Sequence, residues 1–311
     1  MMIPKEREIP HDILQSKEEV LMAKIIQKGP KRGVSIFSYW ELLNYQMDLE
    51  DCFKDMYDMG ATGIEILANG HVDNYPNPSD AWVDEWFRLC EKYNVTPVEY
   101  GHWIDCRLFK GRNLTTEEAY QQLAVDIKLA HKLGFTVMRT KQSVIDDILT
   151  PVENWREIIK MALPLAERYN VKMCPEIHGP TRLDDKMVTD FVEFIEKENT
   201  KWFGLNIDFG VFEKMDFGGR GPMPGARGPS APEDIIPLLP YVYCCHAKFR
   251  HIDENFTDST IPHEKVIQIM KDHGWDGYLL SEYEGQNKED THVVAEQLRR
   301  HHIMMKRVLG Y

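Results

Sequence analysis

The chain has 311 residues, of which 43% are hydrophobic and 28% are charged, a balance typical of a globular protein that buries a sizeable core. Its formal net charge is −13, with lysine and arginine scattered along the chain, which argues against binding a nucleic-acid backbone or an anionic membrane. Six cysteines occur without a CxxC pair, and no apolar run reaches the ~20 residues that span a bilayer. We therefore expect a cytoplasmic protein with reduced thiols and no membrane association.

Residues 1–31 are predicted to form an N-terminal extension that precedes a catalytic domain over residues 32–311. Ser16 and Glu19 fit a helical capping box, and apolar residues follow at helical spacing as far as Gln27. This extension is expected either to cover one end of the main domain or to contact a partner.

From Arg32 onward, short apolar segments alternate eight times with amphipathic ones. The predicted strands cover residues 33–40, 63–67, 95–101, 135–140, 171–179, 203–211, 241–249 and 277–285. The predicted helices cover residues 47–60, 79–94, 115–134, 152–169, 184–198, 233–239, 262–273 and 288–308. Eight strand–helix units predict an α/β fold, a single (β/α)8 TIM barrel with a parallel sheet. The main alternative is an open doubly wound sheet, but the glycine-rich turn that it favours after the first strand is missing from SIFSYWELLN.

Two predicted connections are longer than a barrel requires. They cover residues 102–113, after the third strand, and residues 213–232, after the sixth. Both follow the carboxyl ends of strands, where barrel enzymes build their active sites. We expect these loops to act as lids, with variable surface loops as the alternative.

A potential metal ligand lies at or just beyond the carboxyl end of each of the last four predicted strands. These residues are Glu176, Asp208, His246 and Glu282. Burial of an unpaired charge is costly, and one shared divalent cation would account for all four. Three carboxylates and one imidazole, without a thiolate, suit Mn²⁺ first, with Mg²⁺, Co²⁺ or Zn²⁺ as alternatives. The competing interpretation is a structural network of ion pairs.

The residues two positions beyond these ligands point the same way along each strand, so His178 and Lys248 are expected near the cation. A cation here would act as a Lewis acid that polarises a carbonyl and stabilises an enediolate, which requires a general base. The candidate bases are His178 and His102, and Lys248 or Lys141 would balance the negative charge. Alternatively, His178 orients a ligand, His102 caps a loop, and each lysine pairs with an acid.

Further residues are candidates for binding a substrate. Glu65 is expected either to hydrogen-bond substrate hydroxyls or to form a salt bridge. Trp40 and Trp103 would stack on a ring of the substrate, or belong to the core. Arg220 and Arg227 would bind a phosphate, although no glycine-rich helix start accompanies them.

These motifs resemble the xylose-isomerase-like barrel superfamily of sugar isomerases, epimerases and dehydratases. In that family a Glu–Asp–His–Glu set from the later strands holds one divalent metal. Glu176 in PEIHG, Asp208 in NIDFG, His246 in CCHAK and Glu282 in SEYEG match this set in order and spacing. The segment GATGIEIL resembles the second strand of the family, and the resemblance covers about residues 32–308.

Within the superfamily, the chain is most similar to the catalytic alpha subunits of bacterial C-glycoside deglycosidases. The segments GVSIFSYW, GIEI and SEYEG, and the histidine-containing stretch after the third strand, carry this similarity. It implies metal-dependent cleavage of the carbon–carbon bond between a 3-keto sugar and a flavonoid-type aglycone, through α-proton abstraction and β-elimination. It also implies a hetero-oligomer with a small beta subunit.

Other functions fit the same residues. A sugar isomerase, an epimerase or an inosose-type dehydratase would use the same metal and the same enediolate. An AP endonuclease of the superfamily would be expected to carry more metal-binding histidines and a basic face. A non-enzymatic sensor that kept the fold would not require the four ligands.

Overall fold

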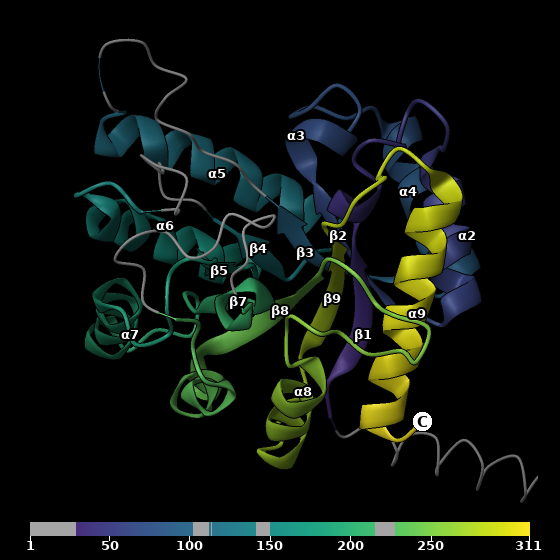
Figure 1. The fold of residues 1–311 in the computed structure, drawn as a ribbon. Coiled ribbons are helices and arrows are strands. Elements are labelled where there is room, and N and C mark those ends of the chain that lie inside the picture. Colours follow the sequence, from purple (N-terminus) through teal and green to yellow (C-terminus); the bar gives the residue numbers. More distant parts are fainter. Residues whose placement is uncertain (1–28, 102–111, 113, 141–149, 215–227) are drawn as a thin grey trace, which may run out of the picture.

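The computed structural model describes residues 29–101, 112, 114–140, 150–214 and 228–311. Within these residues nine parallel strands form one sheet that curves into a nearly closed barrel surrounded by helices (Figure 1). The strands run in the spatial order β5-β4-β3-β2-β1-β9-β8-β7-β6. Their bounds are Lys31–Ser35 (β1), Gly63–Leu67 (β2), Thr96–Gly101 (β3), Val137–Arg139 (β4), Lys172–Cys174 (β5), Glu176–Ile177 (β6), Leu205–Asp208 (β7), Val242–Phe249 (β8) and Tyr278–Tyr283 (β9). The predicted TIM barrel is confirmed.

The barrel closes through β5 and β6, which together correspond to the fifth predicted strand. β5 pairs with β4 and β6 pairs with β7, with Pro175 between them. Proline has no N–H to donate, so it interrupts the ladder, but its carbonyl still accepts a hydrogen bond from Asn206 N at 3.0 Å. Met173 N donates to Trp202 O at 2.9 Å, which joins the two halves of the sheet.

The helices agree with the amphipathic segments, with some corrections. The α-helices are Leu49–Met59 (α2), Ala68–His71 (α3), Asp80–Tyr93 (α4), Thr116–Lys132 (α5), Trp155–Tyr169 (α6), Lys186–Glu198 (α7), His263–Asp272 (α8) and Thr291–Leu309 (α9). The short α3 was not predicted. The segment predicted as an α-helix over residues 233–239 is the 3-10 helix η4, Pro232–Tyr241, because Pro237 and Pro240 cannot donate α-helical hydrogen bonds. The capping box of Thr115 and Glu118 is present at the start of α5.

Two strands end three or more residues before their predicted ends. The first, predicted as far as residue 40, ends at Ser35 and continues as the 3-10 helix η1, Ile36–Tyr39. The sixth, predicted as far as residue 211, ends at Asp208 and continues as η3, Phe209–Phe212. Apolar residues continue through both turns, so hydrophobicity alone did not mark the strand ends. The predicted extension over residues 1–31 and the two long loops lie almost wholly outside the described residues.

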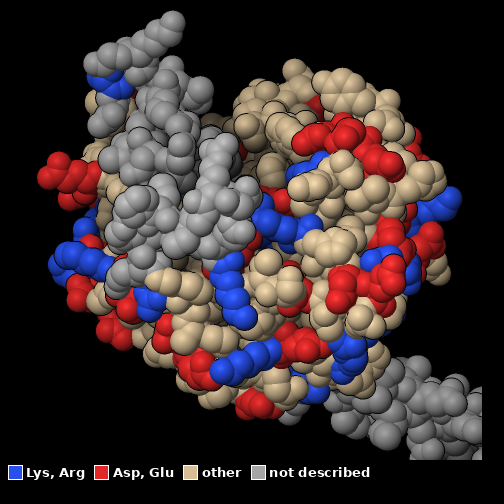
Figure 2. Space-filling view, viewed as in Figure 1, with Lys and Arg blue, Asp and Glu red and all other residues tan. Residues whose placement is uncertain are grey.

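The structure agrees with two expectations from the composition, which are scattered basic residues on the surface and cysteines present as thiols. Lysine and arginine are interspersed with aspartate and glutamate on the face shown in Figure 2. The five described cysteines are free thiols and are buried. No helix within the described ranges is long and apolar enough to cross a membrane.

A buried polar chain fastens α9 to β1 and β9. Arg32 Nη1 donates to His302 Nδ1 at 2.8 Å, so His302 donates through Nε2 to Ser281 Oγ, 3.1 Å away. The Ser281 hydroxyl then donates to His301 Nδ1 at 2.9 Å. Burial holds the pKa of both histidines well below the ordinary range, and the adjacent Arg32 lowers that of His302 further. Both imidazoles are therefore neutral in the folded protein.

The two buried, neutral histidines of this hydrogen-bonded series predict that the protein loses stability in mild acid. Below the ordinary histidine pKa of about 6.5, the unfolded chain binds protons that buried His301 and His302 do not bind. The free energy of unfolding should therefore fall between pH 6.5 and pH 5, by at most about 1.4 kcal/mol per pH unit for each histidine. Denaturant unfolding at several pH values measures this fall. The variant His302→Gln should have a shallower dependence, and a dependence as steep as that of the parent chain would contradict the assignment.

Candidate metal centre

Four side chains from the last four strands of the barrel converge at its carboxyl end. Glu176, Asp208, His246 and Glu282 each offer one ligand atom, and these atoms all lie within 4.8 Å of one another. All four residues are buried. The register of the sheet produces this convergence, because Asp208 on β7 lies opposite His246 on β8, and β8 pairs with β9. The predicted grouping is therefore present, and this set of four is called the quartet below.

The atoms of the quartet fit a hard or borderline divalent cation. Asp208 Oδ1 accepts a hydrogen bond from Gly210 N at 2.7 Å, whereas Asp208 Oδ2 is buried without a hydrogen-bond partner. A Cβ atom at Gly210 would lie 2.5 Å from Asp208 Oδ1, so the glycine leaves room for the carboxylate. A buried, unpartnered carboxylate oxygen is costly, and a cation would satisfy it. Three carboxylates and an imidazole match the donors that Mn²⁺, Mg²⁺, Co²⁺ or Zn²⁺ accept.

The carboxylates of the quartet are not equivalent. Burial alone would raise the pKa of Glu176, but Arg139 and His246 hold it well below its ordinary value. Arg139 Nη1 lies 2.8 Å from Glu176 Oε2. Burial raises the pKa of Glu282 well above its ordinary value, and the neighbouring Glu284 and Asp208 raise it further. The charged form of Glu282 is therefore opposed by burial and by its acidic neighbours, and a divalent cation would offset this accumulation of negative charge.

A second layer of polar side chains lies beside the quartet. Lys248 Nζ lies 2.9 Å from His178 Nε2 and 2.8 Å from Glu284 Oε2. His178 Nδ1 donates to the carbonyl of Gly179 at 2.5 Å, so His178 Nε2 is the acceptor for the lysine. Burial would lower the pKa of Lys248, but Asp208 and Glu284 raise it above its ordinary value. The arrangement thus holds an ammonium group and an imidazole lone pair together.

The other predicted site residues have different outcomes. Glu65 is fully buried, and its Oε1 lies 3.5 Å from Arg139 Nε, which agrees with the salt-bridge alternative. Its role in substrate binding stays a prediction. Trp40 is 45% exposed and packs against His71 with ring centroids 5.4 Å apart, so it is not a core residue. The predicted residues outside the described ranges are His102, Trp103, Lys141, Arg220 and Arg227.

Three buried polar residues around the quartet were not predicted as site residues. They are Glu99, Arg139 and Asn206. A signal was present in each case, because a charged or amide side chain in the middle of an apolar strand requires a partner. The place of Glu99 against β2 also depends on a register shift between Ile64 and Glu65, which the sequence pattern does not show.

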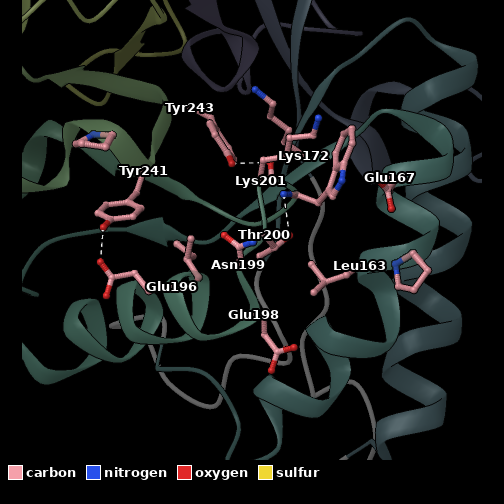
Figure 3. A pocket seen from close by; sticks show the side chains of 14 residues that line it. Leu163, Glu167, Lys172, Glu196, Glu198, Asn199, Thr200, Lys201, Tyr241 and Tyr243 are labelled. Atoms are coloured by element: carbon pink, nitrogen blue, oxygen red, sulfur yellow. Dashed lines mark hydrogen bonds between the residues drawn. The ribbon is translucent and has the colours of Figure 1, made fainter.

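A groove lies at the opposite end of the barrel from the quartet. It has a volume of about 750 Å³ and includes residues from the amino ends of the strands, such as Lys172 and Tyr243 (Figure 3). Its polar groups are already engaged, because the Tyr241 hydroxyl donates to Glu196 at 2.7 Å and the Tyr243 hydroxyl to Lys201 O at 2.6 Å. This groove contains none of the quartet residues, and it lies at the end of the barrel opposite to the one where enzymes of this fold build their active sites.

Comparison with known proteins identifies the family. The family described as xylose isomerase-like TIM barrel matches residues 53–304. The chain belongs to this family. The resemblance inferred from the four strand ends is therefore confirmed.

Two curated relatives of the chain have more specific names. The chain is 24% identical to a 3'-dehydrocarminate deglycosidase alpha subunit of Microbacterium sp, over 90% of this chain and 96% of the relative. It is also 24% identical to a C-glycoside deglycosidase alpha subunit of Arthrobacter globiformis, over 92% of this chain and 94% of the relative. These relatives support an enzymatic function for the chain.

Solved structures in the family share the fold. A D-psicose 3-epimerase from Clostridium cellulolyticum H10 with D-tagatose matches with a TM-score of 0.65 at 17% identity, over 90% of this chain and 99% of that one. A xylose isomerase-like TIM barrel protein from Mycobacterium smegmatis in complex with magnesium matches with a TM-score of 0.59 at 16% identity, over 91% and 99% of the two chains. At these identities the similarity establishes the barrel and no more.

The charge imbalance of the quartet predicts that divalent cations stabilise the protein. A cation at 100 times its dissociation constant adds about 2.7 kcal/mol to the free energy of unfolding, which raises the melting temperature by several degrees. The variant Glu282→Gln should lose most of this rise, because it removes one charged ligand atom. Thermal melting with and without Mn²⁺ measures it.

Glu284→Gln is the matched control, since Glu284 lies two residues further along the strand and pairs with Lys248. It should retain the Mn²⁺-dependent rise. An equal rise in the parent chain, Glu282→Gln and Glu284→Gln would show that the cation binds elsewhere.

Proposed function

We propose that this chain is the metal-dependent catalytic subunit of a deglycosidase that cleaves the carbon–carbon glycosidic bond of a 3-keto C-glycoside. The observation that carries the proposal is the buried quartet with Lys248 and His178 beside it, at the carboxyl end of the barrel. The names of the curated relatives supply the substrate class. The flavonoid-type aglycone is part of the proposal.

Glu176, Asp208, His246 and Glu282 would hold the cation, with Mn²⁺ as the first candidate. When bound, the cation would act as a Lewis acid that polarises the keto group of the sugar and so acidifies the adjacent C–H bond. The remaining catalytic tasks fall to side chains of the protein: taking up the α proton, and balancing the negative charge on the substrate oxygen.

His178 and Lys248 are placed for these two tasks. His178 keeps its Nε2 lone pair toward the centre because Nδ1 donates to the Gly179 carbonyl. Lys248 is an ammonium held by Glu284, and it can donate a hydrogen bond to a developing oxyanion. A substrate oxygen that takes this hydrogen bond would release His178 Nε2 from Lys248 to accept the proton. His102 stays the alternative base.

The proposed reaction is a β-elimination. The α C–H bond breaks, its proton goes to the base, and its electron pair passes into the enolate of the keto group. As the ketone forms again, this pair becomes the double bond between the α and β carbons while the bond from the β carbon to the aglycone breaks. The aglycone carbon leaves with the pair of that bond and takes up a proton from the protonated base or from solvent. The products are an unsaturated keto sugar and the free aglycone, so atoms and charge balance without an oxidant.

A small beta subunit is the proposed partner. The two curated relatives are each named an alpha subunit, which implies a second chain in their complexes. We extend this arrangement to the present chain and propose a hetero-oligomer. The N-terminal extension over residues 1–31 and the long loops are the segments that we propose for this contact or for a lid.

The alternative function is a sugar isomerase, an epimerase or an inosose-type dehydratase. The quartet and the Lys248–His178 pair serve removal of an α proton equally well when no aglycone is attached. Incubation with free ketoses in deuterated water separates the two functions. Deuterium at the α carbon without bond cleavage would favour the alternative.

The proposed function predicts strict dependence on the keto group. The purified chain, together with its co-expressed small partner and Mn²⁺, should cleave a 3-keto C-glycoside and leave the unoxidised glycoside intact, because only the ketone acidifies the α proton. Chromatography of the released aglycone measures both reactions. Equal cleavage of the two compounds would contradict the mechanism.

Replacement of the proposed base provides a second test. His178→Gln should lower kcat by about 10²- to 10⁴-fold with little change in metal content, as expected for loss of a general base. His251→Gln is the control, because His251 is an exposed histidine on the same side of the barrel. If His178→Gln retains full activity and His102→Gln does not, His102 is the base.

A further inference from the structure

We propose that Glu99 is a positioning residue that fixes the tautomer of His246, so that Nδ1 is left free to bind the cation. This inference rests on the proposed metal centre and adds a residue that sequence reasoning did not identify. Glu99 lies on β3, across the barrel from His246 on β8, and both side chains are fully buried.

The two nitrogens of the His246 ring face different groups. Nδ1 lies 2.9 Å from Glu176 Oε1 and 3.6 Å from Glu282 Oε2, on the side of the quartet. Nε2 lies 3.0 Å from Glu99 Oε2, on the opposite side, and also 3.0 Å from Asn206 Nδ2. Asn206 Nδ2 is within hydrogen-bond distance of both Glu99 oxygens, so its protons go to the carboxylate and Nε2 donates to Glu99. A neutral imidazole carries one proton, and a metal ligand requires a lone pair. An acceptor at Nε2 therefore selects the tautomer that leaves Nδ1 unprotonated toward the quartet.

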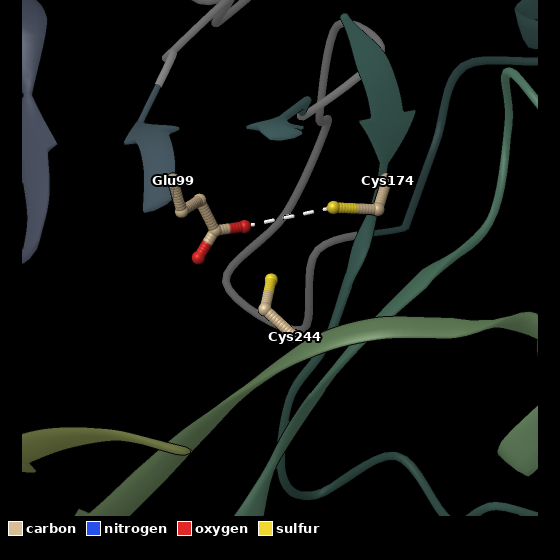
Figure 4. Close-up of side chains that lie close together, drawn as sticks. All are labelled: Glu99, Cys174 and Cys244. Atoms are coloured by element: carbon tan, nitrogen blue, oxygen red, sulfur yellow. Dashed lines mark hydrogen bonds between the residues drawn. The ribbon is translucent and has the colours of Figure 1, made fainter. Parts of the chain in front are cut away.

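Other side chains hold the Glu99 carboxylate in the orientation that accepts from His246. Asn206 Nδ2 lies 3.2 Å from Glu99 Oε1 and 3.3 Å from Oε2. The orientation of this amide is itself fixed, because Asn206 Oδ1 accepts from His246 N at 3.2 Å. The Cys174 thiol donates to Glu99 Oε1 at 3.5 Å (Figure 4). These groups are donors, so the carboxylate stays an acceptor.

Glu65 is the competing candidate for this role. Its Oε2 lies 3.3 Å from His246 Nε2, which is further than Glu99 Oε2, and its Oε1 faces Arg139. Glu65 Oε1 and Oε2 both lack a hydrogen bond within the described structure. The carboxylate of Glu65 therefore balances the charge of Arg139, while Glu99 accepts the ring proton.

Glu99 also lies beside Cys174 and Cys244, a trio that has the atom types of a thiolate metal site. Cys174 Sγ, however, donates to Met138 O at 3.4 Å as well as to Glu99, so it acts as a thiol. Both cysteines belong to an apolar cluster with Val98, Val137 and Leu280. The two thiols therefore pack beside Glu99 as part of the apolar interior of the barrel and do not form a metal site.

The test compares Glu99→Gln with Glu65→Gln in the full chain. Glutamine at position 99 can turn its amide nitrogen to His246 Nε2, which would place the ring proton on Nδ1. Glu99→Gln should therefore bind Mn²⁺ about 10- to 100-fold more weakly than the parent chain, the usual effect of losing such a partner. Glu65→Gln should stay within about threefold, since Glu99 still accepts from Nε2. Calorimetric titration with Mn²⁺ measures both affinities.

A spectroscopic readout separates positioning from a general loss of structure. In the parent chain saturated with Zn²⁺ and labelled with ¹⁵N-histidine, long-range ¹H–¹⁵N spectra should show His246 protonated at Nε2, assigned by comparison with His246→Gln. Circular dichroism of the metal-free variants checks folding. If Glu99→Gln does not fold, Asn206→Ala replaces it and should weaken Mn²⁺ binding severalfold.

The outcomes are distinct. If Glu99→Gln bound Mn²⁺ as tightly as the parent chain and kept the His246 proton on Nε2, the role of Glu99 would be overturned. The metal centre would remain intact. If Glu65→Gln bound Mn²⁺ more weakly than Glu99→Gln, the positioning role would belong to Glu65 instead. A parent chain that binds no divalent cation would overturn the metal centre itself and this role with it.

Discussion

The structure depends on one electrostatic constraint, which is the burial of three carboxylates and one imidazole at the same end of a closed barrel. Glu176, Asp208 and Glu282 come from different strands, and the register of the parallel sheet forces their side chains together. Like charges at this distance in an apolar interior destabilise the folded state unless a cation is present. This cost to folding supports our proposal that the quartet binds a divalent cation.

The interior of the barrel changes from apolar to polar between the amino and the carboxyl ends of the strands. The layer nearest the amino ends is apolar apart from two thiols, and it supports Glu99. The next layer contains the quartet with Arg139 and Asn206, which orient its members. Lys248 lies opposite Glu282 in the register of β8 and β9, and with His178 it lies toward the carboxyl ends of the strands, where a substrate would enter a barrel of this kind. The side chains that we propose for the chemistry therefore lie on packed strands or directly after one.

Much of this arrangement could be predicted from the sequence, because strand ends and alternation are local properties. Glu176 and His178 share a face of one strand, and so do His246 and Lys248, whichever neighbours they have. The position of Glu99 could not be predicted, since it depends on a register shift against β2 and on a distance across the barrel. The early ends of β1 and β7 were also missed, because apolar residues continue into the 3-10 turns.

The central claim is that the quartet holds one divalent cation, and anomalous diffraction tests it most directly. Crystals of the full chain grown with Mn²⁺ and measured at the manganese absorption edge should show one strong peak per chain, within bonding distance of Glu176, Asp208, His246 and Glu282. A peak elsewhere, or a quartet paired only among its own side chains at saturating Mn²⁺, would contradict the account.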